Sequence, residues 1–554
     1  MIKTTLIAIA CCAQLSGLTA ACGQGAESVS GPRYRIAGVV VDSTTGVPVS
    51  RATVVLLGSA DRRVHVSTQT NPDGAFGFSH IPAGKYSLVA IRLGYIASNF
   101  NQHGEYSTAI VTGEGQDTEH IRFPLEASSA IVVNVQDDFG EPVTGAQVHI
   151  FRKSEFKGYD VELFPLLSGV TEDSGKRTSY NLQPGEYYVA VSAHPWYAMN
   201  DRAGGEGAEA GRAVNPALDL AYPTTYYDNA TNEADAAPVV LAPGHREQIT
   251  VTLHAVPALH LSLSALLGQG TSQQELAPEL HPIVFGRPLD LPDRWQFDPD
   301  SSGEEINGVA PGDYQLLQGE PRRSSELHLA GSAGAANGPA AASVEVKLRT
   351  ANGSPLPKEL TVAMMSADRS RKRPVVSEEV KGETCTFVGV KPGTVQFHVM
   401  TKEGSFTVEG ITVSGKLQAE DRLVVKDQPL SIEITFGEAT GKIEGFALRD
   451  GKGVANTLVE LVPRDLQAHG DQIRLDQADS DGSFLLPRVA PGDYTVVAIE
   501  GGWDLDWRDW RVLRPFLAAG EQITVPANQS AAVSLPEPVH VQQTAAVRRG
   551  AQAH

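Results

Sequence analysis

Cysteine is scarce in this 554-residue chain, and its four copies restrict the redox chemistry available to the protein. Cys11, Cys12 and Cys22 fall within the first 22 residues, so Cys385 alone belongs to the body of the chain. A single thiol cannot form an internal disulfide bond, and large domains do not require one even after export. Cys385 alternates with Phe387 along an expected strand, which predicts a buried and inert thiol.

The motifs of common hydrolases and nucleotide-binding enzymes are also missing. The sequence contains no His-x-x-Glu or His-Glu-x-x-His zinc motif, no Gly-x-Ser-x-Gly nucleophile elbow and no glycine-rich phosphate loop after a strand. The 15 histidines are scattered along the chain. These absences predict a protein that is not an enzyme and that has no catalytic residue, bound metal or other cofactor.

Long apolar runs and excess positive charge are absent as well. Beyond the N-terminal segment no run approaches about 18 apolar residues, so no transmembrane helix is expected. The formal net charge is −20, which offers no electrostatic attraction to nucleic acid or to an anionic membrane surface. With 41% apolar residues over 554 positions, the chain is expected to form several domains of roughly 50–200 residues each.

The first 22 residues are typical of an export signal. A short basic start precedes an apolar stretch that ends in small residues, which is the pattern of a secretory signal peptide. The end of this segment resembles a bacterial lipobox, in which Cys22 becomes the lipidated first residue. The lipobox pattern prefers an aliphatic residue where this chain has Thr19, so lipidation and ordinary cleavage both stay open. We therefore expect an exported protein, either an outer-membrane lipoprotein, a periplasmic protein or an extracellular one.

A hairpin followed by a Pro-Gly turn recurs along the chain and organises it. In the clearest copy, Asp481-Gly482 marks a hairpin, Pro491-Gly492 marks a second turn, and an aromatic and β-branched strand starts at Tyr494. The corresponding prolines lie 81 to 127 residues apart, which is about the length of one β-sandwich domain. Solenoid repeats are shorter, at about 20–50 residues. The earlier copies contain Pro82, Pro184, Pro311 and Pro392.

The order of these motifs resembles the carboxypeptidase regulatory-like domain, a transthyretin-like β-sandwich. The resemblance covers residues 33–126, where a strand from Tyr34, a Gly-x-Pro-Val turn, the Asn71–Phe76 hairpin and the strand after Pro82 follow one another. The same order recurs at 441–500, and less completely at 130–191, 343–400 and 258–318. The resemblance implies an all-β fold of about five tandem Ig-like or transthyretin-like sandwiches. It also implies membership of a carbohydrate-binding-like superfamily, with a polysaccharide as ligand.

These matches divide the chain into successive segments. We expect a signal peptide at 1–22, a carboxypeptidase regulatory-like domain at 33–127, a second such sandwich with an aromatic insert at 128–256, a degenerate sandwich at 257–330, a further sandwich at 343–437, a regulatory-like domain with a Trp-rich insert at 438–537 and a disordered tail at 538–554.

Three of the five tryptophans gather in the insert of the last domain and are candidate ligand-binding residues. Trp503, Trp507 and Trp510 are spaced by four and three residues, so on a helix they would share one face, with Asp504 or Asp506 as the N-cap. Two interpretations follow. The face is a platform for stacking on sugar rings, or it seals the open side of the sandwich.

A second aromatic group occupies the matching place in the second domain. Trp196 and Tyr197 follow the strand after Pro184, and Tyr222 and Tyr226 come shortly afterwards. Loops at the ends of β-sandwiches are common binding sites, so Trp196 and Tyr197 are also candidate ligand-binding residues. The alternative is a loop that packs onto its own sandwich.

The sequence therefore predicts a non-enzymatic extracellular or envelope binding protein. Its expected partner is a polysaccharide or an envelope protein; nucleic acid is not expected, and a membrane is expected only through the lipid anchor. Two alternatives remain. The chain is a structural or adhesive surface stalk that binds proteins through sheet edges, or it is an accessory module of a secreted peptidase or TonB-dependent transporter.

Overall fold

The computed structural model describes most of the chain between residues 32 and 544. The expected signal peptide, with Cys22, lies outside the described residues. Among the residues that are described, no helix is long and apolar enough to cross a membrane. Not described within that stretch are residues 60–64, 154–162, 199–214, 263–278, 290–304, 319–322, 331–335, 338–341, 367–375, 391, 402–403, 420–421, 427, 438–440, 467–471, 508 and 527–531.

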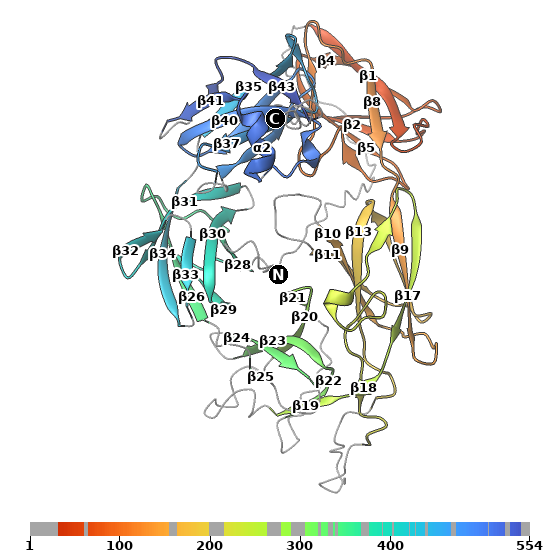
Figure 1. Ribbon diagram of the computed structural model, residues 1–554. Helices are drawn as coiled ribbons and strands as arrows, with labels where there is room; N and C mark the ends of the chain where they lie inside the picture. The colour runs from red at the N-terminus through yellow and green to blue at the C-terminus, as the bar shows by residue number, and fades with distance from the viewer. Residues whose placement is uncertain are drawn as a thin grey trace, which may run out of the picture.

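The described chain is almost entirely β-structure, as the sequence predicts. Its strands pair within five consecutive groups that form tandem β-sandwiches (Figure 1). We call these groups sandwiches one to five, and they cover 33–125, 129–253, 256–337, 342–437 and 441–543. One short ladder, between β14 (Leu220–Ala221) and β18 (Val256–Pro257), joins sandwiches two and three. The predicted fold class is confirmed.

Sandwich one buries its core between two sheets. Its strands are β1 (Arg33–Asp42), β2 (Thr53–Gly58), β3 (His65–Gln69), β4 (Ala75–Pro82), β5 (Gly84–Ile91), β6 (Ser98–Asn99), β7 (Ile110–Thr112) and β8 (Ile121–Leu125). One sheet has the order β4-β1-β8, and the other has the order β3-β2-β5-β6 with β7 also paired to β5. Alternate residues of each strand point inward, so Leu56, Leu88 and Phe123 meet in the core.

Sandwich two repeats this arrangement. Its strands are β9 (Ser129–Asp137), β10 (Gln147–Lys153), β11 (Leu163–Val170), β12 (Lys176–Leu182), β13 (Gly185–Ser192), β14, β15 (Thr225–Tyr226), β16 (Val239–Leu241) and β17 (Arg246–Leu253). The sheets are β12-β9-β17 and β11-β10-β13-β15, with β16 paired to β13. The aliphatic positions of β9, β10 and β13 fill the core between them.

Sandwiches three and four continue the array. Cys385 is buried in sandwich four beside Phe387, as their alternation predicts. The short strand β25 (Ala336–Asn337) lies between two of the expected domains. Sandwich three contains β18, β19 (Leu259–Ser262), β20 (Glu279–Val284), β21 (Arg287–Pro288), β22 (Glu305–Val309), β23 (Gly312–Gln318), β24 (Arg323–Leu329) and β25 (Ala336–Asn337). Sandwich four contains β26 (Ala342–Thr350), β27 (Thr361–Ser366), β28 (Val376–Glu379), β29 (Thr384–Val390), β30 (Gly393–Thr401), β31 (Gly404–Val413), β32 (Lys416–Ala419), β33 (Arg422–Val425) and β34 (Leu430–Gly437).

Sandwich five has a second apolar core on the outer face of one sheet. It contains β35 (Gly441–Arg449), β36 (Lys452–Gly453), β37 (Leu458–Pro463), β38 (Arg474–Gln477), β39 (Ser483–Val489), β40 (Gly492–Glu500), the helix α2 (Trp510–Leu517), β41 (Glu521–Val525), β42 (Ala532–Ser534) and β43 (Val539–Gln543). The expected disordered tail at 538–554 is wrong at its start, because β43 pairs in parallel with β35 and β40. Val539 and Val541 are buried there, so apolar burial orders this segment.

The recurrent turn, which is Pro-Gly in sandwiches two, three and five and Pro-Ala-Gly in sandwich one, has the same structural role in all four. The tyrosine that follows it lies in the core, and its hydroxyl donates to the carbonyl four residues earlier at 2.6 to 3.0 Å. A large ring is thereby buried without leaving its hydroxyl unpaired. The glycine of the turn has φ between +145° and +158°, which favours glycine. The four tyrosines are Tyr86, Tyr187, Tyr314 and Tyr494.

The two ends of the array meet. Figure 1 shows the five sandwiches following one another around a ring, so that sandwich five lies beside sandwich one. Hydrogen bonds between Ala109 and the Asp479–Ser480 turn join the two, across 370 residues of sequence.

Candidate ligand-binding site

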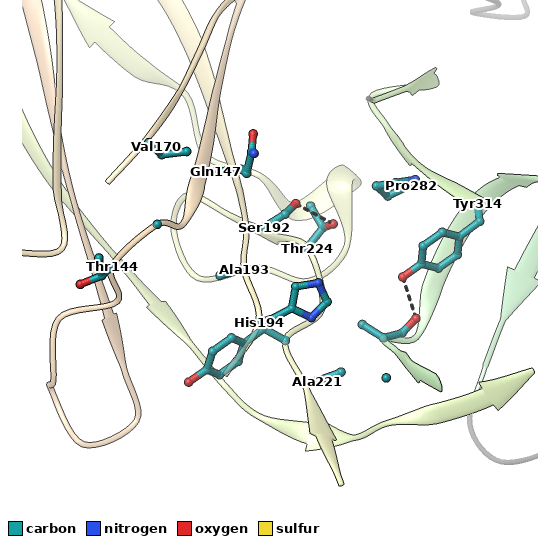
Figure 2. A pocket seen from close by; sticks show the side chains of 14 residues that line it. Thr144, Gln147, Val170, Ser192, Ala193, His194, Ala221, Thr224, Pro282 and Tyr314 are labelled. Atoms are coloured by element: carbon teal, nitrogen blue, oxygen red, sulfur yellow. Dashed lines mark hydrogen bonds between the residues drawn. The ribbon is translucent and has the colours of Figure 1, made fainter. Parts of the chain in front are cut away.

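A cavity of about 310 Å³ lies where sandwiches two and three face each other. Sandwich two supplies the end of β13 with Ser192 and the segment that follows it with His194. Sandwich three supplies Pro282 of β20 and Tyr314 of β23 (Figure 2). The cavity therefore exists only when the two sandwiches are joined.

The lining of this cavity mixes hydroxyl groups with apolar side chains. Ser192 and Thr224 place their hydroxyl oxygens 3.3 Å apart, and the Tyr314 hydroxyl donates to the Ala310 carbonyl at 2.8 Å (Figure 2). Of the 14 described residues that line the cavity, none is Asp, Glu, Lys or Arg. Hydroxyl groups both donate and accept hydrogen bonds, so this lining suits a neutral ligand that carries hydroxyl groups.

Trp196 and Tyr197 lie next to the cavity. Trp196 comes two residues after His194, and its side chain is 84% exposed. Its ring meets the Tyr197 ring edge-on, with 5.7 Å between centroids and an interplanar angle of 88°. Tyr197 is hydrogen-bonded to Tyr222, which lines the cavity, and burial is the main cause that raises the pKa of Tyr222. The structure thus brings Trp196 and Tyr197 together with Tyr222 of the same aromatic group, beside cavity residues such as Ser192 that the sequence did not single out.

An aromatic plug fixes the two walls of the cavity. Phe285, at the tip of the β20–β21 hairpin, inserts into sandwich two and contacts Phe151, Tyr188 and Tyr226. Its ring centroid lies 4.9 to 5.7 Å from theirs in edge-on geometry. Such pairs stabilise a contact by about 0.5–1.5 kcal/mol each beyond their area burial. Tyr226, part of the expected aromatic group, therefore packs against the neighbouring sandwich.

The structure separates the three tryptophans of the last insert. Trp503 lies in the 3-10 helix η3 (Gly502–Asp504), Trp507 lies in the loop after it, and Trp510 begins α2. The expected shared helical face is therefore wrong, and so is the expected cap. Asp509 caps α2 by accepting a hydrogen bond from the Arg511 amide, because the chain leaves η3 in an extended conformation before the helix starts.

Each tryptophan of the insert has its own environment. Trp507 is 4% exposed and packs in the second core with Leu513 and Phe516. Trp510 is 44% exposed, and the Arg514 guanidinium lies 5.5 Å from its ring centroid. The interpretation in which the insert seals the sandwich agrees with the position of Trp507.

Trp503 contacts sandwich one. Its ring stacks on His103 with 4.9 Å between centroids and an interplanar angle of 5°. The Tyr106 ring lies 5.5 Å away, and the indole nitrogen donates to the Asn456 carbonyl at 3.3 Å. One face of the indole is therefore covered by another part of the chain.

Comparison with known proteins identifies one segment. The model of the family described as "Carboxypeptidase regulatory-like domain" matches residues 35–126, which is sandwich one and agrees with the resemblance read from the sequence. No curated protein matches the chain.

The solved structures that match the chain include two bacterial pilins and the Bacillus anthracis TIE protein. GBS52, the minor pilin of Streptococcus agalactiae, is 11% identical, covers 40% of this chain and 97% of its own, and has a TM-score of 0.21. The shaft pilin SpaA from Lactobacillus rhamnosus GG is 9% identical, covers 41% of this chain and 97% of its own, and has a TM-score of 0.19. The Bacillus anthracis TIE protein is 9% identical, covers 94% of this chain and 75% of its own, and has a TM-score of 0.17. TM-scores of this size carry no inference about function.

Proposed function

We propose that this protein, whose sandwich one is similar to the carboxypeptidase regulatory-like domain, is an exported, non-enzymatic binding protein of the cell envelope or the extracellular space. Its ligand is a polysaccharide, held at the cavity between sandwiches two and three. The observation that carries this proposal is the position of Trp196, which is 84% exposed beside a hydroxyl-bearing cavity whose described lining contains no Asp, Glu, Lys or Arg.

The chemistry of this site matches a neutral sugar. The flat indole of Trp196 offers an apolar surface for the C–H face of a pyranose ring. Ser192 and Thr224 offer hydroxyl groups to the sugar hydroxyls, since each can donate and accept. No Lys or Arg is found among the described residues that line the cavity, which favours a neutral polysaccharide over a sulfated or uronic-acid polymer.

The test is a polysaccharide array followed by calorimetric titration of the positive ligand. We expect Trp196→Ala to weaken binding about tenfold, since losing one stacking contact of about 1.4 kcal/mol changes the dissociation constant by that factor. Trp510→Ala is the matched control, because Trp510 is also exposed but lies on α2 of sandwich five. Unchanged affinity in Trp196→Ala, or the absence of any polysaccharide ligand, would refute the proposal.

The two other roles considered make different predictions. A surface stalk requires an extended array, and the contact between sandwiches one and five favours a closed one (Figure 1). An accessory module of a secreted peptidase or of a TonB-dependent transporter would co-purify with that partner.

A further inference from the structure

The contact between sandwiches one and five is built from specific polar groups, and we call it the clasp. It consists of Lys85 and residues 101–111 of sandwich one, and of residues 477–483 with Trp503 of sandwich five. The Ala109 amide donates to the Asp479 carboxylate at 2.9 Å. The Ser480 amide donates to the Ala109 carbonyl at 2.9 Å, and the Val111 amide donates to the Ser480 hydroxyl at 2.8 Å. These bonds run along the edge of β7.

A buried glutamine recognises sandwich one. Gln477 is 1% exposed, and its amide nitrogen donates to the Asn101 carbonyl at 2.6 Å and to the Thr108 hydroxyl at 2.8 Å. Its amide oxygen lies 3.0 Å from Nδ1 of His103, the ring that stacks on Trp503. Both ends of the Gln477 amide are thus paired by the other sandwich, which makes the contact selective for its partner.

An ion pair completes the clasp. The Lys85 ammonium lies 2.7 Å from the Asp479 carboxylate and donates to the Ser483 hydroxyl at 2.8 Å. Burial raises the pKa of Asp479, and the Lys85 charge opposes that rise. Burial also raises the pKa of the neighbouring Asp476, to about 6. The Lys85 ammonium therefore offsets part of the cost of burying the Asp479 carboxylate.

Each face of the clasp is held in its conformation by hydrogen bonds within its own sandwich. The Asp479–Ser483 turn is closed by its own hydrogen bonds, from the Gly482 amide to the Asp479 carbonyl and from the Asp479 amide to the Ser483 carbonyl, both at 2.9 Å. β7 is held by β5 of sandwich one. Among the described residues, each apolar core cluster of these two sandwiches stays within one of them. Polar contacts between preformed domains resemble transient protein–protein interfaces, which open and close without unfolding.

The chain between the two clasp faces affects whether a face binds its own chain or a second copy of it. The two faces are 370 residues apart, with three sandwiches between them. Three folded sandwiches rather than a short flexible linker connect the two faces, so each face meets its partner on the same chain at a finite effective concentration. A second copy at high local concentration therefore competes with the chain's own other end. Each copy carries two clasp faces. When sandwich one of each copy binds sandwich five of the other, all four faces are paired and the result is a two-fold symmetric dimer. A single contact between two copies leaves two faces unpaired.

We propose that the clasp is a self-recognition pair through which two copies of this chain associate, with sandwich one of each copy binding sandwich five of the other. The closed ring in Figure 1 is the form that the single chain takes when no second copy competes. This inference does not depend on the polysaccharide site.

Charge reversal tests the proposal with the full chain. In Lys85→Glu, two acids face each other across the clasp; in Asp479→Lys, two lysines do. Each variant alone is expected to remain monomeric with an open clasp. Mixed one to one, the variants form a dimer with two complementary clasps, because the two substituted side chains pair with reversed charges at one clasp and the native pair forms at the other. Light scattering after size-exclusion chromatography is therefore expected to show twice the monomer mass in the mixture alone.

Two controls keep this result interpretable. Lys347→Glu and Glu383→Lys reverse an exposed pair in sandwich four with a 3.8 Å separation, and their mixture is expected to stay monomeric. The double variant Lys85→Glu/Asp479→Lys in one chain is expected to close like the native protein, as measured by its radius of gyration. A monomeric clasp mixture beside a closed double variant overturns the proposal.

A second measurement does not depend on the folding of any variant. Native chains with two different affinity tags are incubated together near millimolar concentration and then diluted. Exchange is expected to produce mixed dimers that co-purify through either tag. Failure of the tags to co-purify would show that the clasp forms only within one chain.

Discussion

Glu460 presents a clear test of how this protein tolerates an uncompensated polar group. It lies in β37 of sandwich five with its side chain fully buried, and neither carboxylate oxygen has a hydrogen-bond partner among the described residues. Its cross-strand neighbours are Leu475 and Val497, which belong to the second core beneath α2. Burial raises the pKa of Glu460 well above its ordinary value, because a buried carboxylate loses its hydration.

We expect Glu460→Leu to stabilise sandwich five. A buried polar group without a hydrogen bond costs about 1–3 kcal/mol, and leucine removes that cost at similar volume. The gain should grow with pH. Because the folded-state pKa is raised, native stability is highest below the ordinary glutamate pKa of 4.5 and falls as pH rises toward the folded-state pKa. The slope for one proton is about 1.4 kcal/mol per pH unit.

Urea unfolding at several pH values, followed by tryptophan fluorescence, measures this effect. Three of the five tryptophans lie at positions 503, 507 and 510, so the signal reports mainly on sandwich five within a multidomain protein. Glu460→Gln keeps an unpaired polar group but cannot ionise, so it should abolish the pH slope with less gain at low pH. Glu444→Leu, at an exposed position of β35, should change stability by less than about 0.5 kcal/mol. A destabilised Glu460→Leu, or a gain independent of pH, would refute the reasoning.

Three further predictions follow from burial. Trp507→Ala should destabilise sandwich five by about 3–5 kcal/mol in the same urea assay while leaving polysaccharide affinity unchanged, because the indole fills the second core; a loss below about 1 kcal/mol would contradict this. Phe285→Ala should expose the joint between sandwiches two and three to limited proteolysis and weaken polysaccharide binding, because the aromatic plug holds both cavity walls; Phe139→Ala, at an 85% exposed position, is the control. Burial lowers the pKa of His149 to about 4, so sandwich two should lose up to about 3 kcal/mol as pH falls from 6.5 to 4; a His149→Gln variant with the same acid sensitivity would rule this out.

Local patterns in the sequence were sufficient to predict the repeated unit. Tyr494 and its three counterparts each lie two residues after the glycine of the turn, and each hydroxyl donates to a carbonyl only four residues away. Such features depend on backbone preferences within about ten residues, so the chain order reveals them directly. The Asp481-Gly482 hairpin was predictable for the same reason, because glycine takes the φ of +83° that the turn requires.

Predictions that needed the path of the chain were less reliable. The spacing of Trp503, Trp507 and Trp510 suits a helical face, but the helix begins only at Trp510, where Asp509 provides the cap. Spacings of four and three place side chains on one face only where the whole segment is helical, and here Trp503 and Trp507 precede the helix. β43 was placed in the tail because its few apolar residues alternate within a polar stretch, and only pairing with β35 and β40 buries them.

The sequence by itself determined the all-β class, the period of about one hundred residues and the positions of the turns, because these follow from local backbone preference and alternating hydrophobicity. Tertiary structure alone decided the neighbours of each exposed or polar group. Gln477 at the end of β38 and Asp479 in the turn that follows have no special role in the sequence until sandwich one covers them. The cavity beside Trp196 has no second wall without Tyr314. These contacts join segments that lie far apart in the sequence, and no local preference encodes such a distance.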